Sequence, residues 1–451
     1  MSCHGRRGPS RSRAIDLGSD SIARVFVSYA VPSVLGLLVM NTAFIVDGII
    51  VGRFVGPFAL AAINLTFPLI MVLSGIGAMI GTGGATLANI RRGAERTHEA
   101  SGLYTVTLLM LAAFGILTLS AGELGLALIP TLLGADESVD FMIVEYLGVI
   151  FLFAPFFIGV FAQDLFIRGD GHPVFPALVL IAGSVANMVL DYLFVGVLGW
   201  GIAGAAWATG LSQVGPFGVM MWYLVRRTCW SLTWVRFPVR TILRMLYNGV
   251  SELVDQASFG VSHYVLNLVL MARIGSLGVA AFSIAAYAFE FTVIVFFGIA
   301  QAIHPPVSFN YGAHNMVRVK RFRDLALAAN LSIGLAGFAL LQVFGSALAG
   351  VFVADPDVVD LASRITFFLS FALVLAGINT TAATFLTSVD RPTESAVIAL
   401  NRSLIALLVG LFALPLAFGL TGIWLTYAFA ESVTFLLVLV VFRRTRLFSP
   451  A

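Results

Sequence analysis

The side chains that could do chemistry in this sequence are a few isolated charges within long apolar runs. Asp47 is the only charged residue between Val25 and Gly52, and Arg53 follows six residues after it. A charge near the middle of a bilayer costs about 2.5–3.5 kcal/mol on insertion scales, so each such residue needs a function or a partner. With a rise of ~1.5 Å per residue, Asp47 is expected ~9 Å from the outer end of its helix.

Three further polar side chains are expected at a similar depth. Asn187 and Asp191 are four residues apart, and therefore on one face of a helix predicted for 174–196. Thr209 is expected about 12 Å inside the next helix, predicted for 201–225. Two carboxylates, an amide oxygen and a hydroxyl from three helices would then meet.

This oxygen-rich set predicts a cation site. Hard oxygen ligands suit a hard cation, and the candidate sodium ligands are Asp47, Asn187, Asp191 and Thr209. Two carboxylates in a low-dielectric medium also suit a shared proton, because desolvation and like charge favour the neutral form of one of them. The competing interpretation is that Asp191 is an interfacial residue beside Tyr192.

The second half of the sequence holds a looser set of acids. Glu252 and Asp255 lie in the stretch YNGVSELVDQASFGVSHYVL (247–266). They predict either a second coupling or substrate-contact site or, because Arg244 is close in sequence, acids solvated near a helix end. His263 is expected to be a hydrogen-bonded packing residue rather than a proton carrier.

Glu290 is the second-half residue best placed to contact a cationic substrate, because it lies near the middle of a predicted helix. Tyr287, Phe289 and Phe291 are near it in sequence and could add cation–π contact. The competing interpretation is a polar pair between two helices, with Glu290 as one partner.

The composition predicts the kind of protein that must position these residues. Of 451 residues, 59% are hydrophobic and 11% are charged, and the mean hydropathy is +0.98. A soluble protein could not bury that much apolar surface, whereas an apolar helix of about 20 residues spans a bilayer. The net charge of +3 does not indicate nucleic-acid binding, because the basic residues lie between apolar runs. Cys3 and Cys229 offer neither a disulfide framework nor metal-ligand spacing.

Turns and charges divide the chain into twelve predicted transmembrane helices. They are expected at 25–50, 58–82, 102–122, 141–164, 174–196, 201–225, 243–271, 279–303, 325–352, 362–388, 394–416 and 419–442. The weakest divisions are at 195–201 and 416–419, where glycines must split a long uncharged stretch into a hairpin.

Charged loops set the orientation. The basic loop residues are Arg91, Arg92, Arg96, Arg226, Arg227, Arg236, Arg240, Arg244, Arg318, Lys320, Arg321, Arg323, Arg443, Arg444 and Arg446. The loops between them hold the acids Asp136, Glu137, Asp140, Asp355, Asp357 and Asp360. Because cytoplasmic loops retain Lys and Arg, both termini are predicted to be cytoplasmic.

The two halves repeat. Three landmarks recur at an offset of 219 residues: GPFALAA (56–62) with GSLGVAA (275–281), Gly93 with Gly312, and Pro173 with Pro392. A fourth, GIAG (201–204) with GLTG (419–422), is one residue from that offset. The predicted fold is therefore an all-α polytopic membrane protein of two parallel six-helix bundles, related by a pseudo-twofold axis along the membrane normal, with a cavity between them.

This repeat divides the chain into expected domains. They are a basic cytoplasmic segment at 1–24, the first bundle at 25–227, a cytoplasmic linker at 228–242, the second bundle at 243–442 and a cytoplasmic tail at 443–451.

The sequence resembles the multidrug and toxic compound extrusion (MATE) family, and specifically its DinF-type branch. Pro32, Asp47, the pair GR (52–53) and ALAAINL (59–65) resemble the family's first two helices. The stretch NMVLDYLFVGVLGWGIAGAAWATGLSQ (187–213) is the most specific match. The resemblance covers essentially all twelve predicted helices.

The resemblance implies roles for these residues. Asn187, Asp191 and Thr209 fall where this branch carries its cation-site residues, and the carbonyl of Ala205 would be a further ligand. Pro32 would mark where the first helix bends when Asp47 changes its charge state. Some branches place an essential acid where Glu252 lies, although that correspondence is looser.

The function implied is secondary active antiport in a bacterial or archaeal cytoplasmic membrane. Inward flow of sodium or protons would drive export of bulky organic, often cationic, compounds, and no cofactor is expected besides the coupling ion. We expect a monomer that contacts drug-like substrates and membrane lipids and requires no ATPase subunit. The sequence has no phosphate-binding loop, since its only lysine is Lys320.

Other functions fit the residues less well. A flippase for lipid-linked saccharides would have the same two-bundle architecture, but the charges predicted within the membrane are chiefly acidic: Asp47, Asp191, Glu252, Glu290 and Glu431 against Arg402. A membrane enzyme would need a nucleophile with its base or a HExxH metal pair, and neither motif is found, so we do not expect an enzyme. A receptor would not need two matching halves with buried acids.

Overall fold

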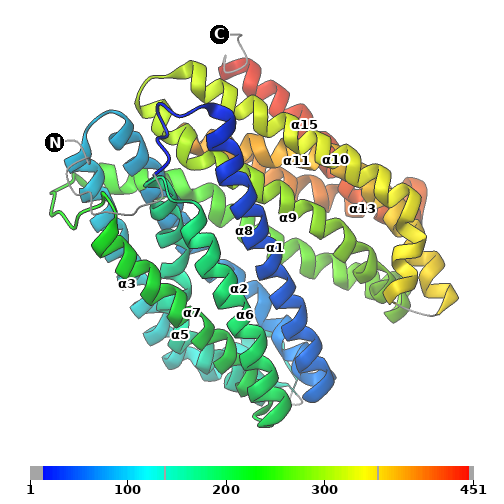
Figure 1. Cartoon of the computed structure of the whole chain (residues 1–451). Helices are drawn as coiled ribbons and strands as arrows, with labels where there is room; N and C mark the ends of the chain where they lie inside the picture. Colours follow the sequence, from blue (N-terminus) through cyan, green and yellow to red (C-terminus); the bar gives the residue numbers. More distant parts are fainter. Residues whose placement is uncertain (1–13, 137–138, 353–354, 446–451) are drawn as a thin grey trace.

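The computed structural model describes residues 14–136, 139–352 and 355–445, and all regular secondary structure in this part of the chain is helical (Figure 1). The first half contains α1 (Ile22–Phe54), α2 (Pro57–Gly93), α3 (Thr97–Gly125), η2 (Leu126–Leu128), α4 (Ile129–Leu133), α5 (Asp140–Gly169), α6 (Val174–Asp191), η3 (Tyr192–Val197) and α7 (Gly201–Arg227). The second half contains α8 (Val239–Ile274), α9 (Ser276–Gly312), α10 (Met316–Phe352), α11 (Pro356–Ser388), α12 (Pro392–Leu400), η4 (Asn401–Ile405), α13 (Ala406–Phe418), α14 (Leu420–Trp424) and α15 (Thr426–Thr445). Cys3, Glu137 and Arg446 lie outside the described residues.

The helices confirm the predicted all-helical membrane fold. Among the described residues, eleven helical stretches are long and apolar enough to cross a membrane by length and composition. The remaining long helix is α7, whose 27 residues include Gly, Ser and Gln side chains that lower its hydropathy. Together with α7, the eleven stretches correspond to the twelve predicted helices.

Several helices extend further than the sequence predicted. α2 was expected at 58–82 but has 37 residues and ends at Gly93, and α10 begins at Met316 rather than at 325. The prediction ended each helix where charges begin, whereas helices of this length, about 55 Å, extend beyond a bilayer core of about 30 Å. For the same reason α8 begins at Val239, which shortens the linker predicted for 228–242, and α15 continues to Thr445.

The two weak divisions are hairpins, as predicted. The chain turns between η3 and α7 at Gly199 and Gly201, whose φ angles are 66° and 61°. It turns between α13 and α14 at Gly419, with a φ angle of 57°. These left-handed conformations are accessible to glycine without steric cost, which explains why glycine separates the helices here.

Backbone geometry supports the repeat independently of residue type. Residues with left-handed φ angles occur in pairs at the predicted offset of 219: Gly56 with Gly275, Glu95 with His314, and Gly171 with Asp390. Gly201 and Gly419 make a fourth pair, one residue from that offset. The turns that join successive helices therefore match in the two halves even where the side chains differ.

The halves meet through reciprocal backbone contacts. A Cβ atom added to Gly93 on α2 would lie 1.9 Å from the carbonyl oxygen of Phe309 on α9, and one added to Gly312 on α9 would lie 2.0 Å from the carbonyl oxygen of Ile90 on α2. Each pair of residues is related to the other by the same offset of 219. Only glycine permits such a close crossing, so the predicted pair Gly93 and Gly312 marks the contact between the halves.

α2 and α8 cross just as closely. A Cβ atom on Gly83 would lie 1.9 Å from the carbonyl oxygen of Met245, and one on Gly249 would lie 1.9 Å from that of Met79. The crossings lie toward the C-terminal ends of α2 and α9 and the N-terminal end of α8. α1 begins and α15 ends at this same side of the molecule, which we call the termini face (Figure 1).

Residues 14–21, which we call the N-terminal strap, lie across the termini face. The amide of Ile15 donates to the carbonyl of Gly171 in the first half, at 3.0 Å. The carbonyl of Leu17 accepts hydrogen bonds from Asn310 Nδ2 and Arg318 Nη2 in the second half, at 2.8 and 3.0 Å. The Leu17 side chain is buried among residues of both halves. The strap therefore connects the halves where they meet.

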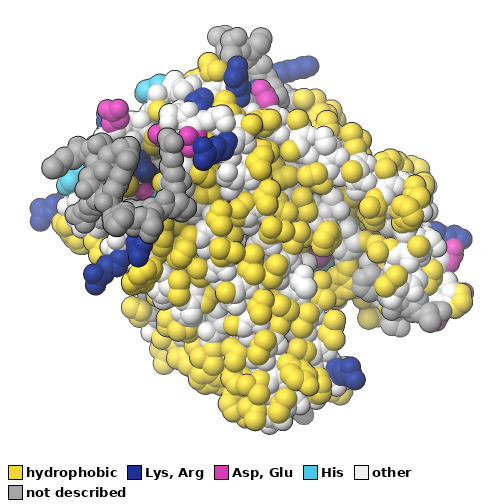
Figure 2. Space-filling model, viewed as in Figure 1, with side chains coloured by type: hydrophobic (Ala, Val, Ile, Leu, Met, Phe, Trp, Pro, Cys, Tyr) yellow, Lys and Arg dark blue, Asp and Glu magenta, His cyan; other side chains and the backbone are white. Residues whose placement is uncertain are grey.

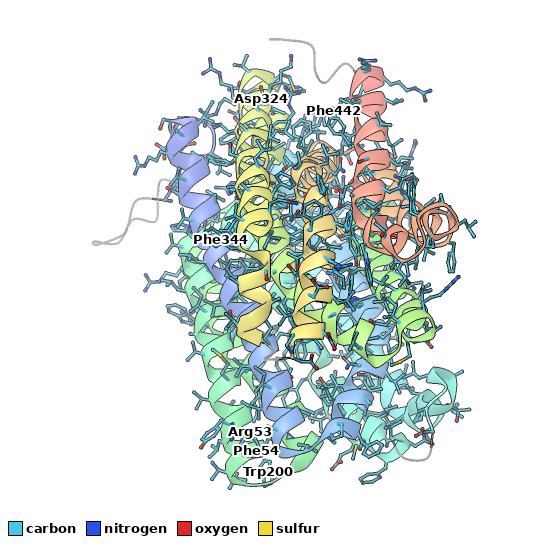
Figure 3. All side chains as sticks on the ribbon, turned by 90° about the vertical axis from the view of Figure 1, so that its right-hand side faces the viewer. Arg53, Phe54, Trp200, Asp324, Phe344 and Phe442 are labelled. Carbon is cyan, nitrogen blue, oxygen red and sulfur yellow. The ribbon has the colours of Figure 1, made fainter. Side chains whose placement is uncertain are left out.

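The remaining surface is typical of a membrane protein. Hydrophobic side chains cover the sides of the helices, while charged side chains gather at the termini face, and the surface is indented between the two lobes that diverge from it (Figure 2). Arg53, Phe54 and Trp200 lie together at the end of the molecule opposite Asp324 and Phe442 (Figure 3).

Candidate functional site

The two first-half carboxylates lie together. Asp47 on α1 and Asp191 at the C-terminal end of α6 face each other. Asp191 is fully buried. Neither of its carboxylate oxygens, nor Oδ1 of Asp47, has a hydrogen-bond partner in the described part of the chain. Asp191 is therefore not the interfacial residue of the competing interpretation but half of a buried acidic pair.

A π-helix follows Asp191 directly. The segment η3 (Tyr192–Val197) continues α6 with a wider turn, in which each amide bonds to a carbonyl five residues earlier. π-Helical turns are rare and occur often at functional sites, because they change the direction of the neighbouring side chains. Here the widened turn begins at the residue whose carboxylate faces Asp47.

The predicted amide and hydroxyl lie next to the acidic pair. Asn187 is one turn before Asp191 on α6 and lies beside its carboxyl group. The Asn187 amide Nδ2 donates to Thr209 Oγ1 on α7 at 3.5 Å, a long hydrogen bond. Ala205 is fully buried on α7, one turn from Thr209. The structure thus brings together Asp47, Asn187, Asp191 and Thr209; the role of Ala205 as a ligand stays a prediction.

Tyr146 is a member of this site that the sequence analysis missed. It lies on α5 with 6% of its surface exposed, within electrostatic reach of both Asp47 and Asp191. Its phenol oxygen adds a fifth polar group from a fourth helix. A tyrosine in an apolar helix is usually assigned to the membrane interface, so the sequence offered no reason to place Tyr146 beside the acidic pair.

Pro32 lies within a continuous helix. α1 runs from Ile22 to Phe54 with Pro32 inside it. Next to the proline, the Ser33 hydroxyl donates to the carbonyl of Tyr29 at 2.7 Å and accepts a hydrogen bond from Arg168. In this structure the side chains around Pro32 are therefore bonded on a helical α1, and bending at this residue stays a prediction.

The second-half acids lie in a different environment from the one suggested by Arg244. Arg244 pairs with Asp390 in the turn between α11 and α12, so it does not neutralise Glu252 or Asp255. Asp255 instead faces Arg402, and a cavity of about 40 Å³ separates it from part of α11. Glu252 lines the same cavity. Arg244 is therefore not the partner of these acids, and their role in coupling or substrate contact stays a prediction.

Glu290 has a different aromatic neighbour from those predicted. Tyr427 on α15 lies within electrostatic reach of Glu290, and the rings of Tyr427 and Phe289 meet edge to face at 5.5 Å. Tyr287 and Phe291 are instead 46% and 55% exposed on the molecular surface. Tyr427 lies 137 residues after Glu290 in the sequence, so no spacing within α9 could indicate this neighbour.

His263 packs against an aromatic ring without the expected hydrogen bond. Its ring stacks on Phe259 with centroids 5.5 Å apart, and Nδ1 is buried with no partner among the described residues. The prediction of a packing residue fits this contact, and the hydrogen bond expected of the His263 ring is not made by Nδ1.

The sequence profile of the MatE family matches residues 32–193 and 256–412, which is most of the chain and both of its halves. The chain belongs to the MatE family. This confirms the resemblance to MATE transporters, and it makes the chain a transporter rather than an enzyme. The DinF-type branch stays a prediction.

Named relatives cover nearly the whole chain. The MatE protein is 25% identical to the multidrug export protein MepA of Staphylococcus saprophyticus, over 93% of each chain, and 24% identical to MepA of Staphylococcus aureus, also over 93% of each. A crystal structure of MATE in complex with MaL6 has a TM-score of 0.91 at 22% identity and covers 97% of this chain and 99% of its own.

A further solved structure has the same fold. An outward-facing multidrug resistance MATE family transporter of the MOP superfamily has a TM-score of 0.89 at 24% identity, covering 97% of this MatE chain and 98% of its own. These likenesses establish the two-bundle fold, in which the acidic pair is held by α1 and α6.

A small cation would stabilise the acidic pair, and its exchange at this site stays a prediction. Two like charges ~4 Å apart repel by roughly 4 kcal/mol at an effective dielectric constant of 20. A sodium ion or a proton at Asp47 and Asp191 would remove this repulsion, and the oxygens of Asn187, Thr209 and Tyr146 could complete its coordination. The site therefore favours cation binding and release over covalent chemistry.

Proposed function

We propose that this protein exports bulky organic, often cationic, compounds in exchange for inward-moving sodium ions or protons. The observation that carries the proposal is the buried pair of Asp47 and Asp191, in which three of the four carboxylate oxygens have no hydrogen-bond partner among the described residues. The multidrug export relatives support an organic cargo.

Alternating access follows from the two halves. Because α2, α8 and α9 cross closely at the termini face, while the lobes diverge away from it, the molecule is closed at the termini face, and rocking of the halves would open these crossings. A cation that binds one arrangement more tightly shifts the population toward it. We assign the termini face to the cytoplasm of a bacterial or archaeal cell membrane, and we propose that a monomer works without an ATPase subunit.

The acids of the second half favour a cationic cargo. Glu290 and Glu252 are candidates for substrate contact, with Tyr427 beside the former. The basic residue predicted within the membrane, Arg402, is paired with Glu431 and is not available to an anionic lipid headgroup. We therefore favour drug efflux over flipping of lipid-linked saccharides.

Efflux from proteoliposomes tests the proposal. A lipophilic cationic dye is followed under a sodium gradient alone and then under a proton gradient alone, so that the two coupling ions are separated. We expect one gradient to drive export by the wild type, and Asp47→Asn and Asp191→Asn to abolish it while the proteins stay folded. Glu123→Gln, which neutralises an exposed acid on α3, is the matched control and should transport normally. Undiminished gradient-driven export by both aspartate variants would refute the proposal.

A further inference from the structure

The second half contains a buried ion pair at Arg402. Arg402 lies in η4, the second π-helix of the described chain, and its Nε donates to Glu431 Oε1 on α15 at 2.7 Å. The two side chains are 18% and 6% exposed. A charge pair this deep in an apolar bundle is costly to form, so it needs further polar partners.

Those partners come from α11 and α8. Asn379 Nδ2 donates to Glu431 Oε2 at 2.7 Å and to the Glu431 carbonyl at 2.8 Å. Asp255 on α8 faces Arg402 and also lies beside Ser403. Arg402 is thus ion-paired with Glu431 and lies within electrostatic reach of a second carboxylate, that of Asp255.

The cluster retains unused oxygen acceptors and space. Asn379 is fully buried, and its Oδ1 atom has no partner in the described part of the chain. The cavity of about 40 Å³ borders Asp255, Glu252 and Arg402. Five hydroxyl-bearing residues also line it, Ser251, Thr380, Thr384, Thr387 and Ser395, and the rest of the lining is apolar: Phe297, Ala383, Ile398 and Ala399. A space of about 40 Å³ is too small for a bulky organic molecule, and its charged and hydroxyl-bearing side could hold a water molecule or a small ion.

The four contributing helices are the counterparts of those that form the first-half site. By the offset of the repeat, α8, α11, the continuous helix of α12 and η4, and α15 correspond to α1, α5, α6 and α7. In both halves two acids lie within electrostatic reach of each other, and one contributing helix contains a π-helical segment, although η3 and η4 are not at equivalent positions of the repeat. In the first half the described residues supply no cation to the pair, whereas in the second half the protein supplies Arg402.

We propose that Arg402 is a resident cation that fills a second cation site, formed by Asp255, Glu431 and Asn379 with the adjoining cavity. Its single positive charge stands where a small monovalent cation such as sodium would otherwise bind between the two carboxylates. The second half is therefore permanently neutralised, and only the first half exchanges a cation. Removal of the Arg402 charge opens the second site.

The test measures sodium binding and not transport. Only the assignment of exchange to the first half rests on the proposed function, and a failed antiport would appear in the efflux assay without affecting this one. Full-length protein carrying Asp47→Asn and Asp191→Asn is the background, because it has no first-half acidic pair. Its thermal unfolding midpoint is measured at pH 8 in sodium chloride and in N-methylglucamine chloride of equal ionic strength.

Added to this background, Arg402→Met is expected to lower the unfolding midpoint in the absence of sodium. Sodium is expected to raise that midpoint again by several degrees, and the rise should saturate with sodium concentration, because a ligand that binds the folded state stabilises it. Arg402→Lys keeps the charge and should show no sodium response. Glu431→Gln combined with Arg402→Met should abolish the response. If Arg402 only held the helices together, its replacement would lower the unfolding midpoint and sodium would not raise it again.

Three outcomes would overturn the proposal. The first is that sodium does not raise the lowered unfolding midpoint of the Arg402→Met variant, or does not restore its folding. The second is a sodium response that persists in the Glu431→Gln combination. The third is a sodium response in the background itself, because the site would then bind sodium with Arg402 in place.

Discussion

The crossing of the halves at Gly93 makes the most direct prediction about the conformational equilibrium. In Gly93→Ala the added Cβ would lie 1.9 Å from the carbonyl oxygen of Phe309, on the backbone of α9. An ordinary carbon–oxygen contact is about 3.3 Å, so α2 and α9 must separate by roughly 1.4 Å. Backbone cannot rotate away as a flexible side chain can, and the crossing itself has to open.

The size of the effect follows from overpacking energies. Inserting a methyl group into a packed site costs about 1–3 kcal/mol. If that cost applies only while the halves are joined at the termini face, it shifts the equilibrium toward the separated arrangement by roughly 5- to 150-fold. The Gly312→Ala variant should act in the same direction, because its Cβ would lie 2.0 Å from the carbonyl oxygen of Ile90.

Pulsed electron–electron double resonance can measure this shift. Spin labels are placed on cysteines at positions 96 and 321, which are exposed on the termini face in different halves, in a protein without native cysteines. We expect the longer-distance population to grow in Gly93→Ala and Gly312→Ala. Gly218→Ala is the control, because a Cβ added at Gly218 would have no neighbouring atom within 4 Å among the described residues, and this variant should be neutral or slightly stabilising. A distance distribution for Gly93→Ala that matches this control would refute the reasoning.

Three other predictions concern the site and the strap. Tyr146→Phe removes the phenol beside the acidic pair, so we expect dye export in proteoliposomes to fall at least several-fold with an unchanged unfolding midpoint; normal export would remove Tyr146 from the site. Arg318→Ala removes hydrogen bonds of 3.0 and 2.8 Å to the carbonyls of Leu17 and Asp20, so we expect limited proteolysis within the strap to accelerate, whereas Arg321→Ala, at an exposed residue of the same helix, should not change it. Burial raises the pKa of Asp16. Hydrogen bonds from Ser19 and from the amide of Gly18, together with the charge of Arg318, lower this pKa by more than burial raises it, so the net shift is downward. The ionised Asp16 carboxylate therefore stabilises the strap at pH values above the ordinary carboxyl pKa, and this stabilisation is lost as the pH falls through the lowered pKa of the folded protein. Proteolysis should accelerate below about pH 4 in the wild type and show a weaker pH dependence in Asp16→Asn.

Local sequence signals were sufficient for the helices and the repeat. Hydropathy identifies a membrane helix within one stretch of chain, and glycines mark the hairpins at 195–201 and 416–419. The offset of 219 residues could be read because turns and close crossings restrict residue type at Gly93, Gly312 and their neighbours. Helix ends were less predictable, because a helix can continue through charged residues once it leaves the bilayer.

Contacts between distant helices were only partly predictable. Asp47, Asp191 and Thr209 could be grouped because charge within the membrane is costly and their depths agree. Tyr146 could not, because a phenol is amphipathic and is common in membrane helices whether or not it faces an acid. The partners of Arg402 and Glu290 depend on which face each helix turns toward its neighbours. A helix that is apolar on every face does not specify that orientation in its sequence.

The matched turns at Gly56 and Gly275, and at Gly171 and Asp390, also indicate how the two halves could diverge after an ancestral duplication. Geometry constrained the backbone at these turns and at the crossings, but it left the positions inside each bundle open to change. The acids of the two halves are not at equivalent positions of the repeat, since Asp47 aligns with Leu266 and Asp191 with Gly410, and only the second half pairs an acid with an arginine. The backbone turns and helix crossings are therefore alike in the two halves, while the buried charged residues differ.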